Sequence, residues 1–230
     1  TVVSYPLAAD GSIGERSSLI QHTGSSVNAE RQEGPHAHAA LFGPSGQRVF
    51  VPDLGADRIF SYRANRDSAT LTPTAQKSVA ANAGAGPRHV RFHPNQIWMY
   101  GINELSGSIT RYDFDIDSGK LTRTETVTTL PADYAGENGC ADLAITPDGR
   151  FLYGTNRGHD SVAAYRIGAG GALEPIAITP SGGKSPQNLE ITADGRWLLV
   201  ANISGGNVAV FRIDPATGRL SQSATRYAVA

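Results

Sequence analysis

A single cysteine, Cys140, excludes a disulfide within the chain and leaves the redox compartment open. No apolar run approaches the roughly 20 residues that a membrane-spanning helix needs. Lysine and arginine (20) nearly balance aspartate and glutamate (21), and the sequence contains no basic stripe. We therefore expect neither nucleic acid nor a membrane as a partner. With 40% hydrophobic residues in 230, the chain can still bury a core.

The N-terminal residues TVVSYPLAAD have neither the basic segment nor the apolar stretch of a signal peptide. We therefore expect a cytoplasmic protein. A periplasmic or secreted location stays open, because the chain also begins without an initiator methionine, as a mature form or a fragment would. The glycine-rich residues 168–171 do not join a strand to a helix, so they indicate a turn rather than a nucleotide loop, and we expect no cofactor.

Four similar segments recur about 50 residues apart, and they organise the chain. Each contains a strand, a tight turn, a second strand, a short loop and a third strand, and a polar fourth strand follows. They begin at His38, Arg88, Ala141 and Gln187. A period of this length built from strands is typical of β-propeller blades. The predicted fold is therefore an all-β propeller of four-stranded antiparallel blades.

The first tight turn contains a glycine in three of the repeats, at Gly46, Gly149 and Gly195. Glycine suits such turns because it adopts positive φ without a Cβ clash. The second repeat has Pro94, Asn95 and Gln96 there instead, so we expect that turn to have another conformation.

The opening residues match only the last two strands of a repeat, so the sequence predicts about four and a half blades in one propeller domain, 1–230. The predicted blades span 1–34 (partial), 35–84, 85–137, 138–184 and 185–230. An open propeller would leave unpaired strand edges and apolar faces, so we interpret the chain as part of a larger ring. A five-bladed ring or a self-completing oligomer is the alternative, and the oligomeric state stays open.

Two repeat positions differ in charge from blade to blade. The start of the first strand carries His38, Arg88, Ala141 and Gln187, and the position after the second strand carries Leu54, Glu104, Arg157 and Ile203. Because first strands lie nearest the central channel, this divergence predicts an asymmetric ligand site; solvated surface charge is the alternative. A third position repeats its residue type, which indicates side chains that bond a turn backbone: Asp53, Asn103, Asn156 and Asn202.

Several stretches carry a family likeness, among them QEGPHAHAALFGPSG, VPDLGADRIFSY, GPRHVRFHPN and GENGCADLAITPDGRFLYGTNRGHDSVAAYRI. They resemble the lactonase family of seven-bladed propellers, which includes bacterial 6-phosphogluconolactonases and fungal carboxy-cis,cis-muconate cyclases. The resemblance covers nearly the whole chain. It implies catalytic roles for His38, Arg88, Glu104 and Arg157, which are the residues that the repeat comparison selects independently.

The same resemblance implies hydrolysis of a sugar lactone such as 6-phosphogluconolactone, with a small anionic lactone or dicarboxylate as substrate. Glu104 or His38 would take a proton from water, while Arg88 and Arg157 would bind the anion and offset developing charge. These groups also suit the cyclisation of a muconate. A propeller that binds or scaffolds without catalysis is the alternative from another class.

His36 and Gln187 complete the predicted substrate-binding set with Arg88 and Arg157. His36 would share a strand face with His38, but no third ligand accompanies this pair, so no metal site is predicted. Gln187 stands where many family members carry arginine, which removes one anion contact. By strand alternation, His89 should face away from Arg88. Cys140 is interpreted as a small packed residue rather than a nucleophile.

Overall fold

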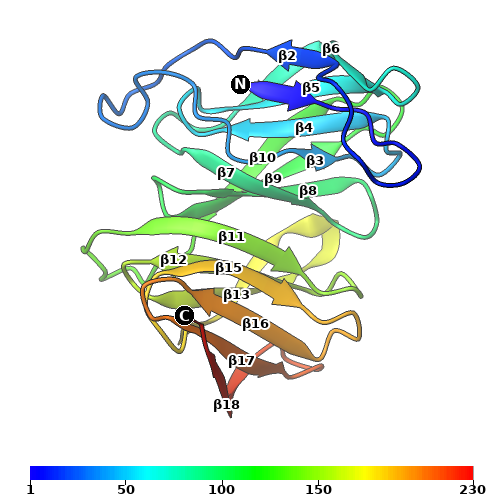
Figure 1. Ribbon diagram of the computed structural model, residues 1–230. Coiled ribbons are helices and arrows are strands. Elements are labelled where there is room, and N and C mark those ends of the chain that lie inside the picture. The colour runs from blue at the N-terminus through cyan, green and yellow to red at the C-terminus, as the bar shows by residue number, and fades with distance from the viewer. Residues whose placement is uncertain (230) are drawn as a thin grey trace.

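The structure is a computed structural model that describes residues 1–229. Within them, eighteen strands form one two-stranded sheet and four four-stranded antiparallel sheets. The sheets follow one another from the N-terminal end at the top of Figure 1 to the C-terminal end at the bottom. The predicted propeller architecture of four blades and part of another is confirmed. One short 3₁₀ helix, Ala169–Gly171, occurs in the described chain, where no helix is long and apolar enough to cross a bilayer.

The strands pair in chain order within each blade, as the repeat pattern predicts. The partial blade contains β1 (Val2–Ser4) and β2 (Ser18–Ile20). The first complete blade contains β3 (Leu41–Phe42), β4 (Arg48–Asp53), β5 (Arg58–Asn65) and β6 (Thr70–Ala80). The second contains β7 (Pro87–Phe92), β8 (Trp98–Asn103), β9 (Ser108–Phe114) and β10 (Leu121–Thr128). The third contains β11 (Gly139–Ile145), β12 (Phe151–Arg157), β13 (Ser161–Ile167) and β14 (Leu173–Pro180). The fourth contains β15 (Pro186–Ile191), β16 (Trp197–Asn202), β17 (Asn207–Ile213) and β18 (Leu220–Ala228).

The core consists of apolar layers between successive sheets rather than one central cluster. Phe50 of the first complete blade packs with Val90 and Tyr112 of the second, and equivalent clusters lie between the other neighbouring sheets. Buried tyrosines reinforce two of these layers: the Tyr100 hydroxyl donates to the Gly171 carbonyl, and the Tyr153 hydroxyl to the Gly218 carbonyl, each in the next blade. Each blade therefore depends on its neighbours to bury both of its faces.

The turn at Gln96 has the same conformation as the glycine turns, so the expectation of a different conformation is wrong. Gln96 has a φ of 66°, beside 66° at Gly46, 75° at Gly149 and 70° at Gly195. In all four turns, the N–H of this residue donates to the carbonyl three residues earlier. The Asn95 side chain accepts a hydrogen bond from the Ile97 N–H, as an aspartate does in the third and fourth repeats, and this contact holds the turn without glycine.

Each inner strand contains a one-residue irregularity where it pairs with the second strand of its blade. The register shifts between Pro87 and His89 in β7, between Cys140 and Leu143 in β11, and between Pro186 and Asn188 in β15. The first complete blade has the same offset, between the Ala37–Asp53 bridge and the Leu41–Phe50 pair. Such bulges bend a strand and redirect a side chain. In every blade the bulge falls at the charge-variable position.

The repeated Asp/Asn position has the structural role that the sequence indicates. Asp53 accepts from the backbone N–H groups of His36 and Ala56, and Asn156 donates to the Thr129 carbonyl. Asp53 also lies 2.6 Å from Nδ1 of His22, a buried residue that follows β2. This contact fastens the partial blade to the first complete one.

Gly195→Ala tests the turn geometry. We expect it to lower the free energy of unfolding by about 1 kcal/mol, because an alanine is strained at positive φ. The new Cβ would come no closer than 3.3 Å to Pro147, so the cost is one of backbone conformation. The control is Gln96→Ala, which keeps a Cβ at the equivalent position and should change the free energy little. Equal losses in urea denaturation of the two variants would contradict this explanation.

Candidate active site

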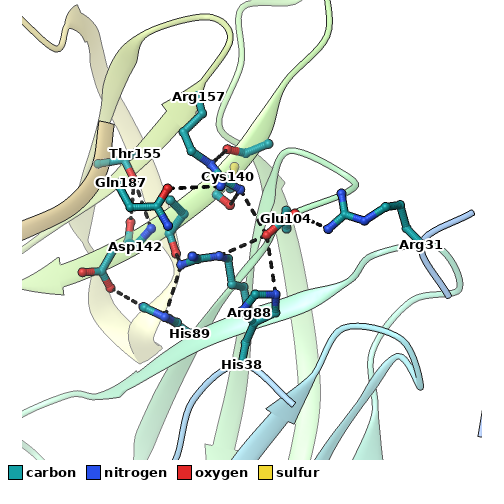
Figure 2. Close-up of polar contacts among 12 residues, drawn as sticks. Arg31, His38, Arg88, His89, Glu104, Cys140, Asp142, Thr155, Arg157 and Gln187 are labelled. Carbon is teal, nitrogen blue, oxygen red and sulfur yellow. Dashed lines mark hydrogen bonds and ion pairs between the residues drawn. The ribbon is translucent and has the colours of Figure 1, made fainter. Parts of the chain in front are cut away.

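Glu104 lies at the centre of a cluster where the inner strands begin and the second strands end (Figure 2). Its Oε1 accepts a hydrogen bond from Arg31 Nη2 at 2.7 Å. Its Oε2 lies 3.0 Å from Arg88 Nε and 3.0 Å from Arg157 Nη2. Only 7% of the Glu104 side chain is exposed. A buried carboxylate therefore binds three guanidinium groups, which come from three different segments of the chain.

His38 faces the same carboxylate from the loop before β3. Its Nε2 lies 3.9 Å from Glu104 Oε2, which is beyond a direct hydrogen bond, and its side chain is half-buried. Burial and the charge of Arg88 lower the pKa of His38 below its ordinary 6.5, and the negative charge of Glu104 does not reverse this. The imidazole is therefore neutral at pH 7 and can accept a proton.

Glu104 is also deprotonated at neutral pH, but for a carboxyl group this is the charged form. Burial alone would raise its pKa, but the hydrogen bond from Arg31 and the charges of Arg157 and Arg31 outweigh burial and hold it below 4.5. Glu104 is thus ionised at neutral pH. Of the two expected proton acceptors, Glu104 therefore fits this environment poorly, because its arginine partners stabilise the carboxylate, whereas His38 remains available to accept a proton.

Arg88 is held from two further directions. Its Nη1 donates to the Ala141 carbonyl at 2.6 Å and to His89 Nε2 at 3.2 Å. Since arginine only donates, His89 Nε2 accepts, and the proton of His89 is on Nδ1, 2.7 Å from Asp142 Oδ1. The prediction that His89 faces away from Arg88 is wrong, because the bulge in β7 interrupts the alternation of side chains.

Arg157 is the last residue of β12 and bonds mainly to the start of β11. Its Nε donates to the Gly139 carbonyl and its Nη2 to the Cys140 carbonyl, at 2.9 and 3.1 Å. Its Nη1 donates to Gln187 Oε1 at 3.2 Å, so Gln187 joins the cluster as a partner of an arginine. Burial raises the pKa of the Cys140 thiol to about 11, so this residue is a protonated thiol and not a nucleophile.

His36 has a different environment from the other predicted site residues. Its Nε2 lies 2.9 Å from Glu33 Oε1 in an exposed pair, and its backbone N–H donates to Asp53. Among residues 1–229, no three histidine, cysteine, aspartate or glutamate side chains are grouped to hold a metal ion.

Three members of the cluster were not predicted as site residues: Arg31, His89 and Asp142. Arg31 lies in the connector between β2 and β3, which is longer than the corresponding connectors before the other blades, so comparison of repeats gives it no equivalent residue. The unusual length of this connector was the available signal, because long loops often carry function. Asp142 occupies the bulge of β11, where its carboxylate also accepts from the Leu143 N–H.

The whole chain, residues 1–230, matches the family model described as "Lactonase, 7-bladed beta-propeller". The chain belongs to this family. It is 36% identical to a 6-phosphogluconolactonase of Bacillus subtilis over 163 residues, which are 71% of this chain and 45% of that protein. It is similar in structure to a protein from Lactobacillus plantarum (TM-score 0.93, 30% identity, 99% of this chain and 65% of that chain). It is also similar to a periplasmic gluconolactonase of Pseudomonas aeruginosa (TM-score 0.93, 31% identity, 99% and 63%).

The lactonase family resemblance that the motifs carry is thereby confirmed. The chain spans about half the length of the curated relatives it matches. It spans about two thirds of the similar solved structures, which agrees with four and a half blades of a seven-bladed ring.

Replacing Glu104 by glutamine should destabilise the protein by about 3 kcal/mol at pH 7, because the substitution leaves buried guanidinium groups without their counter-ion. The folded-state pKa of Glu104 is lowered, so this contribution is complete above pH 4.5 and is lost as the pH falls through the folded value. Urea denaturation of both proteins from pH 7 downward measures the difference.

The control is Glu15→Gln, which removes an exposed carboxylate with no side-chain partner among the described residues. It should leave stability nearly unchanged at every pH. A Glu104→Gln difference that stays constant to pH 3 would contradict an ionised, arginine-paired Glu104.

Proposed function

We propose that the protein is a lactone hydrolase that acts on a sugar lactone such as 6-phosphogluconolactone. The observation that carries the proposal is the convergence of a neutral imidazole, His38, on an ionised carboxylate that is surrounded by guanidinium groups. Ester hydrolysis needs a proton acceptor for water and positive charge for the oxyanion, and this cluster contains both. The names of the Bacillus and Pseudomonas relatives support the same reaction class.

In this proposal, a water molecule lies between His38 Nε2 and Glu104, whose 3.9 Å separation a single water can bridge. The water oxygen attacks the lactone carbonyl carbon while its proton passes to His38 Nε2. The guanidinium of Arg88 or Arg157 stabilises the negative charge that develops on the carbonyl oxygen. Collapse of the tetrahedral intermediate breaks the ring C–O bond, and the imidazolium returns the proton to the departing alkoxide. Glu104 orients the water and holds the guanidinium groups in place.

The pH dependence of kcat/KM tests the role of His38. Its pKa is lowered below 6.5, so the neutral base predominates at pH 7. The rate should therefore fall on acidification only as the pH passes through this lowered value, at a more acidic pH than an ordinary imidazole would give. His38→Gln should reduce kcat by about 10²- to 10⁴-fold and remove this acidic limb. Stopped-flow assays corrected for spontaneous lactone hydrolysis measure both effects. A variant that kept its acidic limb would exclude His38 as the base.

Arg88→Ala should abolish most turnover while the protein remains folded. Losing one oxyanion donor costs about 2.7–4 kcal/mol of barrier, which corresponds to roughly 10²- to 10³-fold in kcat. Arg63→Ala is the matched control. Arg63 is exposed on β5, in register with Arg48 of β4, at the end of the first complete blade that lies away from the cluster. Proton release from a gluconolactone measures the rate, and circular dichroism verifies folding. Unchanged turnover in both Arg88→Ala and Glu104→Gln would refute the assignment.

A further inference from the structure

Arg31 differs from the other two arginines of the cluster in how it is held. Half of its side chain is exposed (50%), compared with 7% for Arg88 and 23% for Arg157. Among residues 1–229, its guanidinium has one partner, Glu104, which it contacts through Nη2 alone. Its Nε and Nη1 therefore remain available to a ligand.

The donors of Arg88 and Arg157 are largely occupied by the protein itself. Arg88 uses Nε and Nη1 for Glu104, His89 and the Ala141 carbonyl. Arg157 uses all three of its nitrogens, for the carbonyls of the β11 start, for Gln187 and for Glu104. A ligand anion that displaced these contacts would leave buried acceptors unsatisfied, which is costly. The donors that an anion can reach without this cost belong mainly to Arg31.

The backbone presents Arg31 from a fixed turn. Asn28 Oδ1 accepts from the Glu30 and Arg31 N–H groups, at 3.1 and 3.0 Å. Gln32 is fully buried; its Oε1 accepts from the Asn28 N–H, and its Nε2 donates to the Leu54 carbonyl at 2.8 Å. The turn is thus anchored beside the second strand of the first complete blade, and the guanidinium arm of Arg31 extends from it toward solvent. A side chain whose backbone is held in place but whose guanidinium is exposed can bind a ligand with little loss of backbone entropy.

We propose that Arg31 determines substrate specificity by binding the anionic group of the substrate, so that the site favours a phosphorylated or carboxylated lactone over a neutral one. This inference rests on the proposed lactone hydrolysis. The cluster contains three guanidinium groups and two carboxylates, those of Glu104 and Asp142, and His38 is neutral, so an excess of positive charge remains that an anion can neutralise. A guanidinium binds phosphate or carboxylate bidentately along an edge formed by Nη2 with Nε or with Nη1. In Arg31 the bond to Glu104 takes one of the two Nη2 hydrogens, so the other Nη2 hydrogen and its neighbouring nitrogen remain free for such a contact.

The test compares kcat/KM for 6-phosphogluconolactone and for gluconolactone in the intact protein and in Arg31→Ala, Arg31→Lys and Arg63→Ala. In Arg31→Ala we expect the preference for the phosphorylated lactone to fall about 10- to 100-fold, because kcat/KM for 6-phosphogluconolactone should fall much further than kcat/KM for gluconolactone. Arg31→Lys should restore part of the preference, because it keeps the charge but loses the bidentate geometry. Arg63→Ala should retain the preference. Equal losses for both substrates in Arg31→Ala would mean that Arg31 only positions Glu104, and would overturn the proposal.

A binding measurement separates this proposal from the proposed function. Calorimetric titration with glucose 6-phosphate and with glucose, which differ only in the phosphate and carry no carboxylate, gives the anion preference without any turnover. If the wild type hydrolyses neither lactone, the proposed function fails, and the loss of glucose 6-phosphate binding in Arg31→Ala still decides the role of Arg31. A wild-type protein that binds both sugars equally, or an Arg31→Ala variant that binds glucose 6-phosphate as the wild type does, would overturn the specificity role.

Discussion

The ionised carboxylate of Glu104 is buried, and a buried charge persists only where opposite charge and hydrogen bonds compensate its lost hydration. Here the compensation comes from Arg31 in a connector, Arg88 on an inner strand and Arg157 at the end of a second strand. Neighbouring blades must therefore be docked before the carboxylate is satisfied. The electrostatics of the site and the packing of the blades consequently depend on each other, which distinguishes this cluster from a set of surface ion pairs.

The bulges explain how a regular repeat produces an irregular site. A strict β-strand would send neighbouring side chains to opposite faces, but the shift at Arg88 lets it and His89 both join the polar network. The same shift in β11 places the Asp142 carboxylate against His89. Because the bulge recurs in every blade, the scaffold supplies one displaced position per repeat. Differences in side chain at that position then change the polar groups of the cluster without a change in the fold.

The repeats made the architecture and five cluster members predictable, because equivalent positions in successive blades converge on one axis. Two predictions were wrong because they applied a local sequence rule to a residue whose conformation depends on its neighbours. Alternation misplaced His89 because a bulge cannot be read from apolar spacing. The preference of such turns for glycine led to a wrong prediction for the turn at Gln96, where the Asn95 side chain accepts the stabilising hydrogen bond. Arg31 could not be predicted as a site residue, because no other repeat has a residue at an equivalent position. Its contact with Glu104 also joins segments that are 73 residues apart in the sequence.

His38 and Glu104 both have lowered pKa values, and arginines of the cluster contribute to both shifts. Burial and the positive charge of Arg88 disfavour the imidazolium form of His38, while the hydrogen bond from Arg31 and the charge of Arg157 favour the carboxylate form of Glu104. An anion that drew a guanidinium away from Glu104 would remove one cause of its low pKa, and its negative charge would offset the positive potential at His38. The proposed occupation of the site by an anion would therefore raise the proton affinity of both groups. In this proposal, anion binding and proton acceptance are linked through the arginines, even where an anion touches neither titrating side chain.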